Sequence, residues 1–179
     1  MSAFVILDRD GVINQDSPEY IKSVEEWLPI SGSLESIAAL NQAGIKVFVA
    51  TNQAGVARGK LTLTSLHEIH QHMLKAVKFG GGLISDIRYC PHHPDELCEC
   101  RKPKPGLLLQ LSVKHHLDLS EGYYVGDSEK DLDAASAAGC TGVLVLTGNG
   151  RATHKSRPDH SLVFDDLMDF TRYLISQKR

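Results

Sequence analysis

The stretch FVILDRDG, residues 4–11, places an unbroken apolar run directly before two aspartates and a glycine. Such a run, without alternating polar residues, is typical of a strand that is buried on both faces, as strands of parallel sheets are. The glycine allows the chain to turn sharply after the strand. The stretch therefore predicts a central strand over residues 4–7, with Asp8 and Asp10 at its carboxyl end.

Strand and helix patterns alternate along the rest of the chain. Further buried strands are expected at residues 46–50, 87–90, 123–125 and 143–146. One helix is expected at residues 34–41, a second begins at Pro105, a third ends at Gly139, and a fourth lies around residues 167–174. A further, long helix is expected to bury Leu63, Leu66, Ile69, Met73 and Val77. This alternation favours a Rossmann-like α/β fold, in which helices cover both faces of a parallel sheet.

Length and composition predict an ordinary folded protein. The chain has 179 residues, of which 42% are hydrophobic and 23% charged, which predicts a single domain over residues 1–179. The start, MSAFVILDRDG, has too short an apolar run for a signal peptide or a spanning helix, so a cytoplasmic monomer is expected. A net charge of -3 gives no general basic surface for nucleic acid or membrane.

Polar clusters fall where the predicted strands end, which is where open parallel sheets bind ligands. Asp8, Asp10 and Asp127 offer carboxylates that repel one another unless a cation or a shared proton is present, and oxygen ligands of this kind suit Mg²⁺. One aspartate is then able to attack a phosphoryl group while another protonates the departing oxygen. Thr51 and Lys102 are the kinds of group that hold phosphoryl oxygens. Aspartates beside glycines are often turn or capping residues, but the whole combination disfavours that interpretation.

A second candidate metal site lies in CPHHPDELCEC, residues 90–100, which holds three of the four cysteines. In a cytosolic chain such a cluster indicates metal ligands rather than disulfides, the alternative being exposed loop cysteines without metal. Cys90, Cys98, Cys100 and one histidine suffice to close a structural tetrahedral Zn²⁺ site, although spacing does not decide between His92 and His93. Zinc would order this loop beforehand and so hold the adjacent Arg101 and Lys102 for an anionic substrate.

Four ordered motifs resemble those of the haloacid-dehalogenase-like phosphatases: DRDGV at 8–12, TN at 51–52, Lys102, and GDSEKD at 126–131. The resemblance implies that Asp8 is a nucleophile that forms an aspartyl-phosphate, and that Asp10 acts as general acid and then as base. It implies that Thr51 and Lys102 stabilise the phosphoryl group. It also implies a set of Mg²⁺ ligands: Asp8, the backbone carbonyl of Asp10, and Asp127, with Asp131 in support.

Within this family, CPHHP at 90–94, CECRKP at 98–103 and TNQAGVARGK at 51–60 are similar to a zinc-containing branch, whose Cys-x-His order favours His92 as the ligand. One activity of the branch removes the 7-phosphate of D-glycero-D-manno-heptose 1,7-bisphosphate, on the route to lipopolysaccharide heptose. The other hydrolyses histidinol phosphate. The resemblance implies that Arg101 recognises substrate and that Asn52 and Gln53 line the site.

The residues favour the sugar bisphosphate, because two neighbouring cations, Arg101 and Lys102, suit a substrate with two phosphates. Histidinol phosphate carries an ammonium and would need a local carboxylate such as Asp16 or Glu19. A non-catalytic, zinc-stabilised binding module is the alternative from another class, and it has no need of both Asp8 and Asp10. Ser128 is a departure, since many members of the heptose branch have a lysine at this position.

The chain has no insertion long enough to be the cap domain that many members of this family carry, so a comparatively open site is expected. Phosphoryl-transferring mutases usually need such a cap to exclude water, which disfavours that reaction. A second histidine cluster, HEIHQH at residues 67–72, is expected to lie on a solvated helix face, as are His115 and His116. Cys140 is expected to be a small buried residue.

Overall fold

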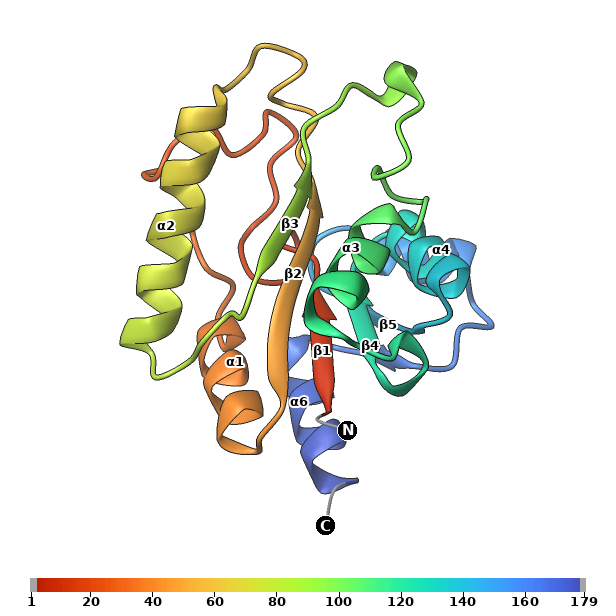
Figure 1. The fold of residues 1–179 in the computed structure, drawn as a ribbon. Coiled ribbons are helices and arrows are strands. Elements are labelled where there is room, and N and C mark those ends of the chain that lie inside the picture. Colours follow the sequence, from red (N-terminus) through yellow and green to blue (C-terminus); the bar gives the residue numbers. More distant parts are fainter. Residues whose placement is uncertain (1–2, 178–179) are drawn as a thin grey trace.

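The structure is a computed structural model that describes residues 3–177, and these residues form six strands. They are β1 (Phe4–Leu7), β2 (Lys46–Asn52), β3 (Ile87–Cys90), β4 (Tyr123–Gly126), β5 (Thr141–Val145) and β6 (Val163–Phe164). All pair in parallel in the order β3-β2-β1-β4-β5-β6, so that β1 lies inside the sheet (Figure 1). The strands predicted near residues 4, 46, 87, 123 and 143 are confirmed, whereas β6 was not predicted.

The helices are α1 (Ser33–Gln42), α2 (Leu63–Phe79), α3 (Gly106–His115), α4 (Glu129–Ala138), α5 (Gly150–Ser156) and α6 (Leu167–Ser176), with 3₁₀ turns η1 (Pro94–Glu96) and η2 (Leu119–Glu121). Thr62 starts α2 by accepting a hydrogen bond from the backbone of Ser65. Gly139 ends α4 with a φ of 71°, a conformation that glycine adopts without strain. The predicted Rossmann-like α/β fold is confirmed, with α5 as an unforeseen element.

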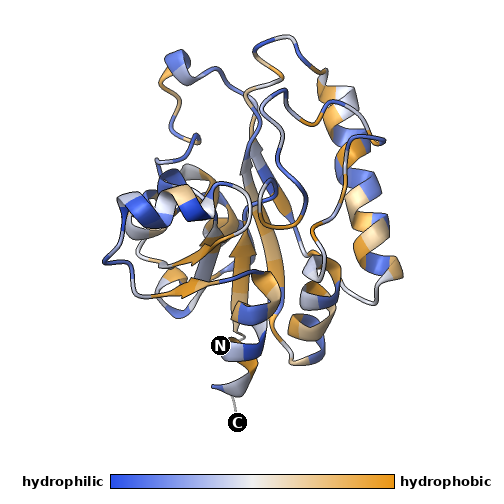
Figure 2. Cartoon of the chain, turned by 180° about the vertical axis from the view of Figure 1, so that it is seen from behind, coloured by the Kyte–Doolittle hydropathy of each residue, from blue (hydrophilic) through white to orange (hydrophobic). Residues whose placement is uncertain are grey.

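Alternate residues of each strand face two different apolar layers. Val5 and Leu7 of β1 pack in the layer that α1, α2 and α6 cover, whereas Phe4 and Ile6 face the layer of α3 and α4. Figure 2 shows the resulting hydrophobic strands between helices that are apolar on one side only. The prediction for α2 was correct at four positions and wrong at Leu63, which is 53% exposed because it lies at the first, peripheral turn of the helix.

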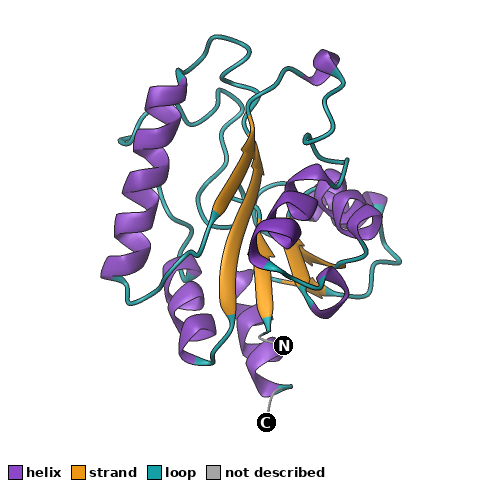
Figure 3. Cartoon of the chain, viewed as in Figure 1, coloured by secondary structure: helices purple, strands orange, loops and turns teal. Residues whose placement is uncertain are grey.

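Long loops gather at the end of the sheet toward which the strand arrows point (Figure 3). Between β1 and α1, residues 8–32 form turns with two isolated bridges, Asp10 to Asn14 and Asn14 to Pro29, and no separate domain. Within residues 3–177, no helix combines the length and the apolar character needed to cross a membrane. The carboxyl ends of the strands lie beneath these loops, and the candidate site lies there.

Candidate active site

A cavity of about 560 Å³ opens at the carboxyl ends of the central strands. Its other walls are residues of the segment 16–21, the start of α4 and Asn149. The cavity brings together every residue expected to act in catalysis or substrate binding, Asp8, Asp10, Thr51, Asn52, Gln53, Arg101 and Lys102, and with them Asp127, which was expected to bind Mg²⁺. These residues come from four separate stretches of the chain, which the parallel sheet aligns at one edge.

Asp8 directly follows β1 and is 8% exposed. Its Oδ1 accepts a hydrogen bond of 2.7 Å from the backbone N–H of Arg9 and lies 3.0 Å from the ammonium nitrogen of Lys102. Burial raises the pKa of Asp8 well above its ordinary value, and the negative charge of Asp131 raises it further, while Lys102 opposes the shift. A single lysine therefore does not compensate the charge of this carboxylate.

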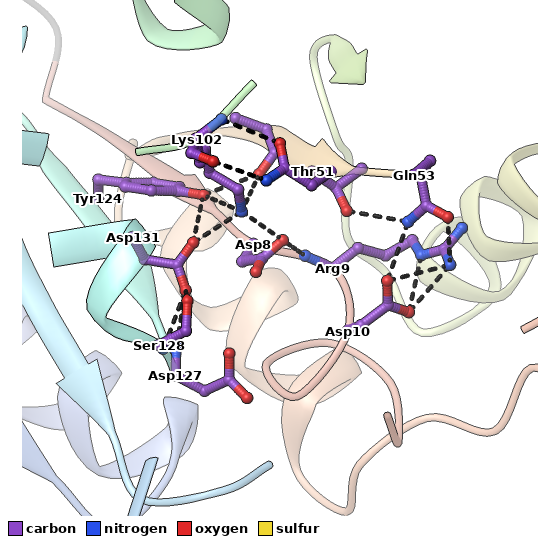
Figure 4. Close-up of polar contacts among 12 residues, drawn as sticks. Asp8, Arg9, Asp10, Thr51, Gln53, Lys102, Tyr124, Asp127, Ser128 and Asp131 are labelled. Carbon is purple, nitrogen blue, oxygen red and sulfur yellow. Dashed lines mark hydrogen bonds and ion pairs between the residues drawn. The ribbon is translucent and has the colours of Figure 1, made fainter. Parts of the chain in front are cut away.

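Lys102 is 3% exposed, and its ammonium group has a full set of partners. The Nζ donates to Asp131 Oδ1 at 2.7 Å, to the Tyr124 hydroxyl at 2.7 Å and to the carbonyl of Ala50 at 3.3 Å. Burial alone would lower the pKa of Lys102, but Asp131 and then Asp8 outweigh burial and raise the pKa. Lys102 is thus a fixed positive charge beside Asp8 (Figure 4).

Asp8, Asp127 and Asp131 form a buried carboxylate cluster in which one oxygen of each lies within 4.8 Å of the others. Asp131 is neutralised within the protein, since it pairs with Lys102 and accepts hydrogen bonds from Ser128. Burial raises the pKa of Asp127 to about 7, and Asp131 adds to the shift while the backbone N–H of Asn149 opposes it. Two under-compensated carboxylates at this spacing suit a hard divalent cation such as Mg²⁺.

Glycines surround the Asp127 carboxylate. A Cβ atom at Gly11 or at Gly148 would collide with Asp127 Oδ2, and both glycines have positive φ angles, 81° and 53°. The same oxygen accepts a 2.7 Å hydrogen bond from the backbone N–H of Asn149. Close backbone approach therefore fixes Asp127 and leaves no space for a side chain beside it.

The Asp10 carboxylate points to the opposite side of the site from Lys102 (Figure 4). Arg9 binds its Oδ1 through Nε at 3.1 Å and NH2 at 2.9 Å, Asn14 donates to Oδ1 at 2.9 Å, and Gln53 donates to Oδ2 at 2.9 Å. Burial would raise the pKa of Asp10, but the Arg9 charge and these hydrogen bonds lower it. The arrangement therefore favours the carboxylate form of Asp10 in this structure.

Polar residues at the end of β2 connect the parts of the site. Thr51, 1% exposed, accepts a hydrogen bond of 3.0 Å from Gln53 Nε2, which also reaches Asp10. The Asn52 side chain donates to the backbone carbonyl of Lys102 and accepts from its backbone N–H, both at 3.1 Å. Asn52 thus fixes the position of Lys102, in addition to lining the cavity.

Arg101 lies beside Lys102 in the cavity wall and is half-buried. Its NH1 nitrogen is buried and has no hydrogen-bond partner among residues 3–177. A buried guanidinium nitrogen without an acceptor is costly, and an anion in the cavity would relieve that cost. Arg101 therefore differs from Lys102, whose ammonium group has a full set of partners.

The cysteine-rich loop gathers Cys90, His92, Cys98 and Cys100 into one cluster. The sulfur of Cys90 is 3.5 Å from that of Cys98, and His92 Nδ1 is 3.2 Å from the sulfur of Cys100. Ligands at about 2.3 Å in a tetrahedral zinc site lie about 3.8 Å apart, so the cluster fits Zn²⁺. His93 lies outside this cluster and caps η1 by accepting a hydrogen bond from the backbone N–H of Asp95.

Several residues of the site were missed by sequence reasoning. Arg9 is fully buried and pairs with Asp10, Tyr124 pairs with Lys102, and Asn149 contacts Asp127. The sequence feature that could have identified Arg9 and Asn149 is their position shortly after predicted strands. The GNGR stretch, residues 148–151, leads into α5, with Asn149 directly before the first residue of the helix.

One prediction for the histidine cluster was wrong. His67 and His72 are exposed as expected, but His70 is 5% exposed, with its ring against Tyr89 at a centroid distance of 5.6 Å. The expectation failed because residue 70 follows the core residue Ile69 on the inward side of α2, where Arg9 provides a polar partner. Cys140 is buried, as predicted.

Comparison with known proteins identifies similar chains. A family model described as HAD-hydrolase-like matches residues 99–170. The D-glycero-beta-D-manno-heptose-1,7-bisphosphate 7-phosphatase of Pseudomonas putida strain KT2440 is 51% identical over 172 residues, which cover 96% of this chain and 98% of that protein. The protein of the same name from Pseudomonas aeruginosa strain PAO1 is 52% identical over 166 residues, 92% and 93% of the two chains.

The fold is also similar to solved structures. The crystal structure of D,D-heptose 1,7-bisphosphate phosphatase from B. bronchiseptica, complexed with magnesium and phosphate, matches with a TM-score of 0.94 and 44% identity. The match covers 97% of this chain and 98% of that one. The similarity therefore extends over nearly the whole of both chains, including the carboxyl ends of the strands.

Proposed function

Because the chain belongs to the HAD-like hydrolase family together with these heptose bisphosphate phosphatases, we propose that it removes the 7-phosphate of D-glycero-D-manno-heptose 1,7-bisphosphate. The observation that carries this proposal is the juxtaposition of Asp8 with Lys102 at 3.0 Å, in a cavity that Arg101 also lines. One end of a bisphosphate would meet the reacting carboxylate and the other a free cation.

We assign the reaction steps to named residues. A carboxylate oxygen of Asp8 attacks the phosphorus of the 7-phosphate, and the bond from phosphorus to the sugar oxygen breaks. Asp10, which must take up a proton in the substrate complex despite its lowered pKa, gives that proton to the departing oxygen and then takes one from the water that hydrolyses the aspartyl-phosphate. Thr51 and Lys102 hold the phosphoryl oxygens during both transfers. The Lys102 charge stays fixed throughout, because Asp131 anchors it.

We propose Mg²⁺ as the cation of this site, held by Asp8, Asp127 and the backbone carbonyl of Asp10. When bound, Mg²⁺ supplies a positive charge that offsets the negative charge of the substrate and of the carboxylates. The raised pKa values of Asp8 and Asp127 support this assignment, as does the glycine-lined position of Asp127.

We propose a structural Zn²⁺ on Cys90, His92, Cys98 and Cys100. The four ligands leave no open position for a reacting water. The site directly precedes Arg101 and Lys102, and the two hydrogen bonds of Asn52 to Lys102 fix the other end of the same segment. Zinc would therefore preorganise the two cations, Arg101 for substrate recognition and Lys102 for phosphoryl transfer.

We further propose that residues 1–179 act as a single-domain, monomeric enzyme in the cytoplasm, in the supply of heptose for lipopolysaccharide. The close clustering of cysteines, which suits metal ligands better than disulfides, and the net charge of -3 support this placement. Asn52 and Gln53 line the cavity that would receive the substrate. Substrate selection would fall to the loops and the start of α4 that line the cavity.

Histidinol phosphate is the second candidate substrate. The observation in its favour is that Asp16, Glu129 and Asp133 line the same cavity and offer negative charge to an ammonium group. The test measures phosphate release in Mg²⁺ from both esters side by side, with Asp8→Asn as the blank. A large preference for the bisphosphate supports the proposal, whereas a preference for histidinol phosphate replaces it. If neither ester releases phosphate, the result would favour a non-catalytic binding module.

A further inference from the structure

His70 is a buried, chemically versatile side chain to which the proposed reaction assigns no part. It lies on α2, 61 residues from Arg9 in sequence, yet its Nε2 is 3.3 Å from Arg9 NH1. His70 is 5% exposed and Arg9 is fully buried, so this contact is shielded from solvent. A buried polar contact between distant segments needs a physical reason, because each group loses its hydration.

The chemistry of the two groups fixes the direction of the hydrogen bond. A guanidinium has only donors, so Nε2 of His70 accepts through its lone pair and the ring proton resides on Nδ1. A protonated imidazole would instead place two positive charges in contact. His70 is therefore neutral here, and burial together with the Arg9 charge lowers its pKa to about 3.

Arg9 connects His70 to Asp10. Its Nε and NH2 bind the Asp10 carboxylate, NH2 also donates to Gln53 Oε1 at 3.3 Å, and NH1 contacts His70. The planar guanidinium is thus held by different acceptors on different edges. Loss of the acceptor at NH1 would free the plane to rotate, and the carboxylate that it orients would move with it.

We propose that His70 is a positioning residue for the phosphatase reaction. It acts through Arg9 to hold the Asp10 carboxyl group in position for proton transfer to the departing oxygen. This inference rests on the proposed function, because it presumes that Asp10 transfers the proton. Misplacement of a reacting group by about 1 Å is able to cost on the order of 100-fold in rate. His70 would influence the rate of proton transfer without touching the substrate.

The test compares two leaving groups in the first turnover. A sugar alkoxide needs a proton from Asp10, whereas p-nitrophenolate leaves without one. His70→Leu removes the acceptor and is expected to slow release of the sugar from heptose 1,7-bisphosphate by at least about tenfold, at an unchanged KM. The first-turnover release of p-nitrophenolate from p-nitrophenyl phosphate is expected to change by less than about threefold, since its bond cleavage is independent of the acid.

Two further variants separate positioning from folding. His70→Gln places an amide oxygen near the position of Nε2 and is expected to keep the rate, whereas His70→Asn is polar but too short to reach Arg9 and is expected to behave like His70→Leu. His67→Leu, an exposed histidine one turn earlier on α2, is the matched control. If His70→Leu does not fold, as judged by thermal unfolding, the comparison is made between the Gln and Asn variants.

The outcomes are distinct. An equal slowing of both esters, no slowing of either, or a glutamine variant as slow as the asparagine variant would overturn the inference and leave the proposed function standing. A wild-type protein that cleaves neither ester would overturn the proposed function, and the inference with it. Selective slowing of the sugar ester, rescued by glutamine, supports both.

Discussion

Lys102 places its ammonium nitrogen 2.7 Å from Oδ1 of Asp131, in surroundings from which solvent is excluded. Asp131 in turn accepts hydrogen bonds from the Ser128 hydroxyl and backbone, which starts α4. The cation beside Asp8 is therefore anchored to a helix N-terminus. The proposed catalytic role of Lys102 depends on the same buried pair that stabilises the fold, so removing either partner should affect both stability and rate.

Lys102→Met is expected to leave Asp8 and Asp131 without their cation. Breaking a buried pair in this way typically costs about 3–5 kcal/mol of unfolding free energy, and loss of one stabilising donor typically lowers kcat by roughly 100-fold or more. Adding Asp131→Asn to Lys102→Met should restore part of the stability and none of the activity. Urea unfolding and initial rates of phosphate release measure the two effects, and a double variant that regains activity would exclude Lys102 as a phosphoryl ligand.

Asp8→Asn is expected to lower kcat by roughly 10⁴-fold or more, as removal of a nucleophile does in other enzymes. Its fold should remain intact, because the pKa of Asp8 is raised by burial and the ionised carboxylate therefore opposes folding at neutral pH. The asparagine variant should unfold at no lower a temperature than wild type in metal-free buffer. Circular dichroism with thermal unfolding checks the fold, and substantial residual turnover would remove Asp8 from the nucleophile role.

Cys98→Ser is expected to lower the zinc content and to raise KM for the bisphosphate more than it lowers kcat. The reason is that the loop then orders Arg101 only on substrate binding, at an entropic cost. Cys140→Ser is the control, since Cys140 is buried near Gly122 and lies outside the cluster of Cys90, His92, Cys98 and Cys100. Zinc is measured by elemental analysis of the purified protein. Unchanged zinc content in the Cys98 variant would show that the four-ligand site is drawn incorrectly.

His70 is expected to make the folded protein sensitive to acid. Its pKa is about 3 in the fold, below the ordinary value of 6.5, so the unfolded chain binds the extra proton between these two values. The contribution of neutral His70 to the free energy of unfolding is fully present above pH 6.5 and is lost as the pH falls toward 3. His70→Gln removes the titration and should gain roughly 2–3 kcal/mol relative to wild type between pH 7 and 4.5. Urea unfolding at both pH values measures the difference, and a pH-independent difference would show that His70 does not titrate on unfolding.

Much of the fold was predictable because the strands are buried on both faces and therefore appear as unbroken apolar runs. FVIL before Asp8 and KVFVA before Thr51 are of this kind, and both strands were located from them. β6 has only two residues at the edge of the sheet, too few to produce a pattern, and α5 begins in a glycine-rich stretch that resembles a turn. Leu63 shows that helical spacing does not tell where the packed part of a helix begins.

The residues of the candidate site were predictable where a side chain lies directly after a strand, as for Asp8, Asp10 and Asp127. Their partners were less accessible to sequence reasoning. Tyr124 is within a strand and resembles any core aromatic, and His70 has exposed histidines on both sides of it. The hydrogen bonds of Tyr124 and His70 depend on which segments the sheet and α2 bring together, and no local pattern encodes that.

The two glycines that contact Asp127 come from opposite ends of the chain, Gly11 soon after β1 and Gly148 just before α5. The proposed metal-binding position at Asp127 is complete only when both segments have docked, so binding of the cation depends on both segments rather than on one loop. A ligand that binds only the native state adds to the free energy of unfolding, by about 2.7 kcal/mol at a concentration 100 times its Kd. The concentration of Mg²⁺ would therefore affect the unfolding temperature of this protein and its rate of proteolysis, as well as its rate of turnover.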